Sequence, residues 1–352
     1  ARTDSWFAGA VGATGRRRDR PELMPAQSDD RDLARAIESV RRGDLLSEAD
    51  VKRLLTARGP AADAVITAAD ELRRAAVGEA VSYVVNCNIN YTNICTYHCG
   101  FCAFSKGKTH DRLRGRPYLR EVDEILAMTA EAAAAGATEV CLQGGIHPDY
   151  TGDTYLGHAR AIRDAFSGIH IRAFSPLEVT HGARTLGLSL GAFLERLRDA
   201  GVRTLPGTAA EILDDEVRAV ICPDKLSTAA WLEVVETAHR VGMRTTSTIM
   251  FGHVERPEHV ARHLIRLRDL QIRTGGLTEF VPLPFVHMEA PLYLKRRTRR
   301  GPTYDEAVLL HAVARLVLHP HVVKIQASWV KMGPAGAQAC LAAGANDLGG
   351  IL

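Results

Sequence analysis

Three cysteines lie close together in the segment NINYTNICTYHCGFCAFSKGK, residues 88–108. Cys95, Cys99 and Cys102 are spaced as Cys-x3-Cys-x2-Cys, and this segment contains no fourth cysteine. A four-iron cluster normally takes four cysteine thiolates, so three thiolates leave one iron open to a substrate or a cofactor. The spacing therefore favours a [4Fe-4S] cluster in which the protein ligates only three irons.

Zinc and a disulfide are the alternatives for such a group of thiols. Structural zinc prefers four ligands, usually in two paired knuckles, and only one knuckle-like element is present here. His98 or His110 could supply a fourth ligand, which leaves zinc open as an alternative. Together with Lys106 and Lys108, these histidines could offset the negative charge of a cluster.

The composition excludes several classes of protein. The 352 residues are 46% apolar, enough for a sizeable core, and the net charge of +3 gives no strong attraction to nucleic acid or to an anionic membrane. No apolar run approaches the ~18 residues of a membrane span. We therefore expect neither nucleic acid nor a membrane as a partner.

Cysteine usage indicates the compartment. Seven cysteines are an odd number in a long chain, unlike the dense cysteine pairs of secreted disulfide scaffolds. A reducing compartment is expected: the cytoplasm or, if a transit peptide was removed, an organellar stroma. Three isolated cysteines are predicted to be small core residues, namely Cys141, Cys222 and Cys340.

Three regions follow one another along the chain. Residues 1–30 mix Gly, Pro, Arg and Asp without a period and are predicted to be a disordered linker. Residues 31–80 contain three helical patterns, and Ser47 with Asp50 is a plausible cap of the second helix. Residues 81–352 form the third region and contain the cysteine segment.

Short runs rich in Val, Ile, Thr and Leu recur through the third region, with helical stretches between most of them. The predicted strands are 81–90, 138–144, 170–176, 202–207, 244–252, 277–285, 322–328 and 346–352. The predicted helices are 121–136, 154–166, 190–201, 228–242, 257–271 and 304–318.

This alternation requires parallel strands with right-handed crossovers, and eight such units close into a TIM-type (β/α)8 barrel of the α/β class. Because the chain starts with Ala rather than Met and its last strand ends at the last residue, we expect a fragment truncated at the C-terminus. Barrels of this kind carry their chemistry in the loops that follow the strands. The cysteine segment follows the first strand.

The stretch Cys95-Thr-Tyr-His-Cys99-Gly-Phe101-Cys102 resembles the signature of the radical S-adenosylmethionine (SAM) enzymes, including its aromatic residue before the last cysteine. The resemblance implies that the amino and carboxylate groups of SAM chelate the open iron. It also implies that one electron from the cluster cleaves the sulfonium and releases a 5′-deoxyadenosyl radical. In such enzymes the cofactor supplies the difficult chemistry and the protein positions it.

Further SAM contacts are implied by the same resemblance. Gln143, Gly144 and Gly145 follow the second strand, where bare backbone can meet the methionine amino group; an ordinary Gly-Pro turn is the alternative. Thr248 and Met250 stand on the fifth strand, which resembles the adenine-side strand of the family. An ordinary apolar strand that ends in Gly is an equally good interpretation of this segment.

Longer stretches are similar to deazaflavin (FO) synthases, from about residue 70 to the end. They are NINYTNICTYHCGFCAFSKGK, TEVCLQGGIHPD, PGTAAEILDDEVR, GGLTEFVPLPFVHMEAP, IQASWVKMGP and GANDLGG. The match is to the half of the synthase, called CofH-type, that joins tyrosine to 5-amino-6-(D-ribitylamino)uracil. One departure is Cys87, where the resemblance leads us to expect Arg.

The resemblance implies a reaction. Hydrogen abstraction from the tyrosine amine breaks the Cα–Cβ bond, glycine imine leaves, and the 4-hydroxybenzyl fragment adds to the uracil ring. A second radical SAM component, separate or fused, then closes the deazaflavin ring, and a ferredoxin or flavodoxin is the expected electron donor. Because the chain has one cysteine triplet, it can carry only one of the two steps.

Polar residues near strand ends are the candidates for substrate contact and catalysis. A buried Glu could hold the tyrosine ammonium or take its proton. The catalytic candidates are Glu178, His287, Glu211 and Gln326, and further pocket candidates are Thr208, Glu279 and Trp329. Glu211 and Glu279 could instead pair with barrel arginines.

Other functions remain open from the sequence. A futalosine-type radical SAM synthase of the menaquinone pathway shares the cysteine loop and the barrel. An iron–sulfur electron carrier would normally keep all four irons ligated by protein. The basic run 295–300 could indicate a zinc-stabilised RNA-binding module, but it is short and lacks interleaved aromatic residues, so a solvated loop is the simpler interpretation.

Overall fold

The computed structural model describes residues 27–105 and 116–351. Most of the segment predicted as a linker, and the flanking Lys106, Lys108 and His110, lie outside these described residues. Within them, no helix combines the length and the apolar character that a membrane span requires.

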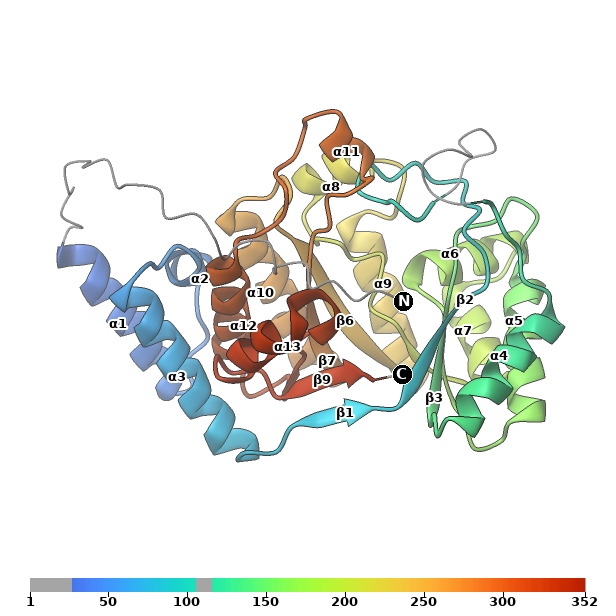
Figure 1. Cartoon of the computed structure of the whole chain (residues 1–352), viewed down its shortest axis with the longest axis horizontal. Coiled ribbons are helices and arrows are strands. Elements are labelled where there is room, and N and C mark those ends of the chain that lie inside the picture. Colours follow the sequence, from blue (N-terminus) through green and yellow to red (C-terminus); the bar gives the residue numbers. More distant parts are fainter. Residues whose placement is uncertain (1–26, 106–115, 352) are drawn as a thin grey trace.

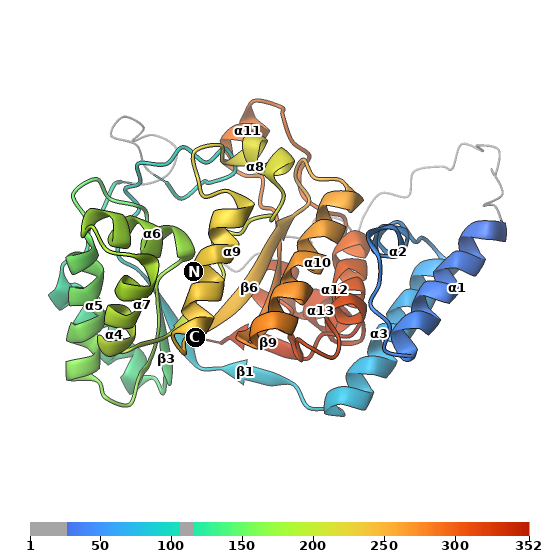
Figure 2. The same cartoon turned by 180° about the vertical axis from the view of Figure 1, so that it is seen from behind.

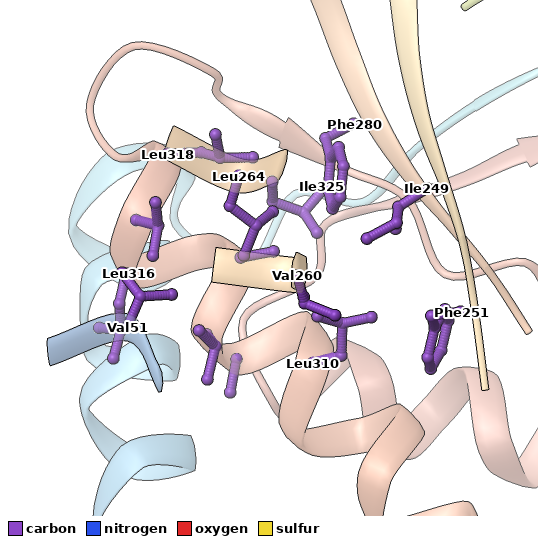
Figure 3. Packing of buried hydrophobic residues seen from close by; sticks show 14 of the residues in the cluster. Val51, Ile249, Phe251, Val260, Leu264, Phe280, Leu310, Leu316, Leu318 and Ile325 are labelled. Atoms are coloured by element: carbon purple, nitrogen blue, oxygen red, sulfur yellow. The ribbon is translucent and has the colours of Figure 1, made fainter. Parts of the chain in front are cut away.

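Three N-terminal helices precede the barrel (Figure 1, blue). They are α1 (Gln27–Arg41), α2 (Glu48–Leu55) and α3 (Pro60–Val77). The predicted cap is confirmed, since the Ser47 side chain accepts from the Asp50 N–H and the Asp50 carboxylate accepts from the Ser47 N–H. These helices pack on α10 (Pro257–Thr274) and α12 (Tyr304–Leu318), and Figure 3 shows Val51 of α2 beside Leu316 of α12 in the shared core.

The predicted α/β class with parallel strands is confirmed. The strands are β1 (Ser82–Val84), β2 (Asn86–Asn90), β3 (Glu139–Gln143), β4 (His170–Arg172), β5 (Val202–Leu205), β6 (Arg244–Phe251), β7 (Leu277–Pro284), β8 (Lys324–Ile325) and β9 (Asp347–Gly350). Each of the eight predicted runs contains one of them, except the first, which is divided into two strands at Val85.

The strands curl around a common interior. β2 to β8 form a parallel sheet in chain order, and β1 pairs in parallel with β9. A single bridge between Gln326 and Asp347 connects the end of β8 to β9, and β1 leads through Val85 into β2. The strands therefore form two parallel sheets around one interior, joined by this bridge and by the chain at Val85.

Helices cover the outside of the strands. In chain order they are α4 (Val122–Ala134), α5 (Gly152–Ala165), α6 (Pro176–Thr185), α7 (Leu190–Asp199), α8 (Asp215–Ile221), α9 (Thr228–Arg240), α10, α11 (Pro291–Leu294), α12 and α13 (Trp329–Leu341). All six predicted helices are present, whereas α6, α8, α11 and α13 were not predicted.

The core has two main parts. One lies between β6, β7, α10, α12 and the N-terminal helices, and the other lies between β2 to β5 and helices α4 to α7. The prediction that Cys141, Cys222 and Cys340 are core residues is confirmed, since all three are buried and free.

All strands of the sheet are parallel, so their carboxyl ends meet at one end of the barrel. Both views of the chain place the loop after β2 at this end, together with the short helices α8 and α11 (Figures 1 and 2). The cysteine segment therefore lies where the loops of the barrel converge.

Candidate active site

The cysteine loop is fixed to the barrel by backbone hydrogen bonds. The N–H of Thr96 donates to Ile146 O (2.9 Å), and the N–H of Gly100 donates to Ile221 O at the end of α8 (2.8 Å). The carbonyl of Gly100 accepts from the Leu292 N–H of α11 (2.8 Å), and a Cβ at position 100 would come within 2.7 Å of the Leu292 side chain. Glycine is thus needed between Cys99 and Cys102 because α11 approaches the backbone closely.

Cys95, Cys99 and Cys102 line one cavity of about 220 Å³. Backbone N–H groups point at two of the sulfurs: Ile146 N lies 3.3 Å from Cys95 Sγ, and Ser105 N lies 3.2 Å from Cys102 Sγ. Such donors favour thiolates and tune the potential of an iron–sulfur cluster. The residues therefore fit a cluster bound at one wall of this cavity.

The spread of the thiols argues against a single ion. Among the described residues, the only potential ligand groups whose atoms all lie within 4.8 Å of one another are those of Asp214, Glu216 and His259. The three cysteines do not meet this condition, as a cluster of several irons allows and one zinc ion does not. Asp214 is held by Arg262 Nε at 2.7 Å, so that carboxylate already has a cationic partner.

A buried ion pair lies beside the cysteines. Lys225 Nζ contacts Glu211 Oε1 at 2.6 Å and lies 5.5 Å from the centre of the Phe101 ring. Burial is the largest single influence and works to lower the pKa of Lys225, but the neighbouring acidic groups, Glu211 first among them, together raise the pKa, so the lysine stays charged. Burial also raises the pKa of the Cys99 thiol, which means that a bound metal must stabilise its thiolate form.

The glycine pair after β3 allows the cysteine loop to approach. A Cβ on Gly144 would come within 2.3 Å of the Tyr91 ring, and a Cβ on Gly145 would lie 2.1 Å from Ile94 O and 2.9 Å from Cys95 Cβ. Both glycines and Gln143 line the cysteine cavity. The missing side chains therefore have a packing reason in addition to the cofactor contact predicted from the sequence.

Glu178 joins three segments at the wall of this cavity. It is 1% exposed, and its carboxylate accepts from the Ser175 N–H (2.7 Å) and hydroxyl, the Gly144 N–H (3.2 Å) and the Tyr91 hydroxyl. Ser175 is the N-cap of α6, Gly144 follows β3, and Tyr91 follows β2. The side chain thus holds the wall of the cavity together.

Burial raises the pKa of Glu178 to about 6, although its hydrogen-bond donors oppose the shift. A carboxyl with a raised pKa binds its proton more tightly in the folded state, so it stabilises the fold below about pH 4.5 and loses this contribution as the pH rises through about 6. The loss is about 2 kcal/mol. We expect a Glu178→Gln variant to lack this pH dependence when the free energies of unfolding of the two proteins are compared between pH 4.5 and 7. If the free energy of unfolding changed with pH in the same way in both proteins, Glu178 would not be the group that titrates.

A second cavity of about 310 Å³ lies inside the barrel and shares Gln143 and Thr208 with the first. Its polar lining comes from alternate residues of the strands. These are Asn86 and Asn88 of β2, Arg172 of β4, Thr246 and Thr248 of β6, Glu279 of β7, and Gln326 after β8. Trp329 and Lys331 of α13 complete the wall.

Arg172, a charged residue in the wall of the inner cavity, is paired with two carboxylates. Its guanidinium contacts Glu279 Oε1 at 2.8 Å and Glu139 Oε1 at 3.1 Å. The expected pairing of Glu279 with a barrel arginine is therefore confirmed. Glu211, for which the same pairing was considered, is paired with a lysine instead.

Two predicted site residues lie away from both cavities. His287 packs edge-on against the ring of Tyr293, with ring centres 4.5 Å apart, and lines neither cavity. Met250 packs against the core, and its N–H donates to Glu211 O at 2.7 Å.

Cys87 packs with the core of β2 to β5 on the outer face of β2, so the position is remote from the cysteine loop.

Several residues of the site belong to no recognisable sequence pattern. Lys225 stands in a turn after α8, and only the fold brings it to Phe101. Tyr91 and Ser175 are ordinary loop and cap residues. Arg172 did carry a signal, because a charged residue flanked by apolar residues within a strand pattern must face a polar interior.

Two family models match successive regions of the chain. Residues 89–267 match the Radical SAM superfamily, and residues 274–352 match the CofH/MqnC C-terminal region. The FO synthase of Streptomyces coelicolor is 48% identical over 307 residues, which are 87% of this chain and 35% of that protein. The FO synthase of Mycobacterium tuberculosis is also 48% identical, over 92% of this chain and 37% of its own length.

A shorter relative matches along most of its length. The 5-amino-6-(D-ribitylamino)uracil–L-tyrosine 4-hydroxyphenyl transferase of Methanothermobacter thermautotrophicus is 47% identical over 299 residues, which are 85% of this chain and 80% of that protein. The chain therefore spans little more than a third of the FO synthases but most of this transferase.

Two solved structures have a similar fold. Methylornithine synthase (PylB) gives a TM-score of 0.70 at 22% identity and covers 90% of this chain and 86% of its own. The hydrogenase maturase HydG from Carboxydothermus hydrogenoformans gives 0.69 at 16% identity, covering 92% and 71%. At these identities the likeness concerns the fold alone.

Proposed function

Because this chain belongs to the radical SAM superfamily, we propose that it is the tyrosine-dependent transferase of FO biosynthesis. It would join the 4-hydroxybenzyl group of L-tyrosine to 5-amino-6-(D-ribitylamino)uracil. The observation that carries the proposal is the transferase relative, which is 47% identical over 80% of its own length. The longer FO synthases suggest a second radical SAM component, separate or fused, that completes the deazaflavin.

The outer cavity would hold the cofactors that the family implies. Cys95, Cys99 and Cys102 would hold a [4Fe-4S] cluster, and the backbone around Gly144 and Gly145 would meet SAM. When bound, these cofactors supply a radical that removes a hydrogen atom from the substrate amine. The protein's own part here is to bind, to orient and to exclude water.

The inner cavity would hold the two substrates next to the cofactors. The side-chain amide groups of Asn86, Asn88 and Gln326 offer neutral donors and acceptors, which suit a ribityl chain and a uracil ring. The apolar wall includes Trp329 and Leu283 and would suit an aromatic ring. Gln143 and Thr208 stand where the two cavities meet, beside the place where hydrogen transfer must occur.

Lys331 is the residue we assign to the tyrosine carboxylate. Arg172 is already paired with two carboxylates. Lys331 has no such partner among the described residues: burial lowers its pKa, and no carboxylate opposes the shift. A carboxylate that enters the inner cavity would therefore find Lys331 as its available cation.

Replacing Lys331 by methionine is expected to raise the KM for tyrosine roughly 10- to 100-fold, because a hydrogen bond between charged groups contributes about 1.5–3 kcal/mol. The KM for the uracil substrate should stay unchanged, and so should the affinity for tyramine, which lacks the carboxylate. Lys324→Met, at the exposed start of β8, is the matched control. An equal loss for tyrosine and tyramine would exclude this role.

The product decides between this function and its neighbours. The matched C-terminal region is shared with MqnC-type enzymes, so a futalosine-type reaction is the second candidate. We expect the reconstituted chain, given SAM, a reductant, tyrosine and the aminouracil under anaerobic conditions, to form the coupled adduct, glycine-imine hydrolysis product and 5′-deoxyadenosine in equal amounts. Complete deazaflavin from this chain alone, or turnover without tyrosine, would contradict the proposal.

A further inference from the structure

The basic run Lys295-Arg296-Arg297-Thr298-Arg299-Arg300 has no part in the proposed reaction. The fold places it directly beside the cysteine loop. It continues from α11, whose Leu292 N–H donates to Gly100 O between Cys99 and Cys102 (2.8 Å). Figures 1 and 2 both show α11 at the open end of the barrel. The run therefore lies on the surface above the predicted cluster ligands.

Most of these charges are available to a partner. Arg299 is neutralised, since it contacts Glu306 at 2.8 Å and Glu255 at 3.4 Å. Lys295, Arg296, Arg297 and Arg300 are exposed, and none of them makes an ion pair with a carboxylate of the described residues. Four positive charges on six residues, none paired with a carboxylate in the part of the chain that the structure describes, give a strong local field although the whole chain carries only +3.

This surface is ordered and has an apolar centre. The Lys295 N–H donates to Pro291 O (3.0 Å) and the Arg297 N–H to Leu292 O (2.8 Å), so α11 and the start of the run form one compact turn. Leu294 on this turn is 56% exposed, and Met288 just before it is 46% exposed. Exposed apolar side chains surrounded by charges are the usual composition of a protein–protein interface.

From these observations we propose that α11 and residues 295–300 form the docking surface for a small acidic one-electron carrier protein. Radical SAM chemistry requires one electron to enter at the cysteine loop, and the carrier would be oxidised by one electron as the cluster is reduced by one. No proton or heavy atom is transferred at this surface. An RNA is the other polyanion to consider, but Tyr293, the aromatic residue of α11, is packed on His287 and is not free to stack on a base.

The test is a triple variant, Lys295→Gln, Arg296→Gln and Arg297→Gln, in the full chain. Its control removes the same charge at the opposite end of the barrel: Arg203→Gln, Arg240→Gln and Lys324→Gln, three exposed residues at or just before the amino ends of β5, β6 and β8. The first readout is direct binding of reduced flavodoxin, an acidic carrier, measured by titration without SAM or substrates. We expect the triple variant to bind roughly tenfold more weakly at low salt, and the difference to shrink as salt is added.

The second readout separates electron entry from the rest of the reaction. With dithionite, a small chemical reductant, all three proteins should form 5′-deoxyadenosine at equal rates; with flavodoxin the triple variant alone should be roughly tenfold slower. This outcome does not depend on which product the enzyme makes, so it can fail separately from the proposed function. Three results would each overturn the docking surface. The triple variant could bind flavodoxin as well as the unchanged protein, or the control could lose as much flavodoxin binding as the triple variant. The triple substitution could also weaken RNA binding and leave flavodoxin binding unchanged.

Discussion

Replacement of Cys95, Cys99 or Cys102 by alanine abolishes iron binding and lowers 5′-deoxyadenosine formation by roughly 1,000-fold or more, if the loop holds the cluster as we infer. Each of the three lines the same cavity, and the loop segments that carry them are held by hydrogen bonds to the loop after β3, to α8 and to α11. Two thiolates cannot support a cube whose remaining corner must stay open. Iron, sulfide and 5′-deoxyadenosine are measured after the same anaerobic reconstitution.

Cys87→Ala is the matched control for these variants. This thiol is only eight positions from Cys95, yet it lies on the outer face of β2 and packs with the core. We expect it to keep its iron and its activity. Iron loss in the Cys87 variant, or normal iron in any of the loop variants, would mean that the ligand set is wrong.

Lys225→Met is expected to lower the free energy of unfolding by about 3–5 kcal/mol, because it leaves a buried carboxylate without its cation. The side chains of Lys225 and Glu211 are 8% and 14% exposed and only 2.6 Å apart. The double variant Glu211→Gln with Lys225→Met should regain most of this loss, since it removes both charges. Urea unfolding followed by circular dichroism measures the difference.

Lys324→Met controls for the loss of a lysine as such and should change stability by less than about 0.5 kcal/mol, because that side chain is exposed. Equal destabilisation in the single and the double variant would show that Lys225 acts through its packing on Phe101 instead of through its charge.

The strands could be predicted because each is a short apolar run between helical segments, and the parallel arrangement followed from this alternation. Four helices were not predicted, and two of them were missed for identifiable reasons. The segment of α13 contains Gly333-Pro334, which reads as a break, and Gly333 does have a left-handed φ of 68° in the kink between the two halves of the helix. The segment of α6 begins at Pro176, shortly after β4, and the predicted strand 170–176 ended on this same residue, so the start of a helix there was missed.

The three cysteines could be selected as candidate ligands from their spacing, because they are close in the sequence and line one cavity in the fold. The residues around them come from distant segments: Lys225 lies more than 120 positions after Cys102. Nothing local marks such a residue, because its role is created when the turn after α8 packs against the loop after β2. Glu178 was singled out as a polar residue near a strand end, but its four hydrogen-bond donors come from three different loops and could not be read from the pattern.

The central claim is that three thiols of one loop hold a cluster whose fourth iron faces the cavity that receives SAM. Mössbauer spectroscopy of the reconstituted chain, recorded before and after addition of SAM, tests it most directly. We expect about four irons and four sulfides per chain, with one iron changing its spectrum when SAM binds. The account would be contradicted if no iron changed its spectrum when SAM is added, or if the chain contained zinc and no sulfide.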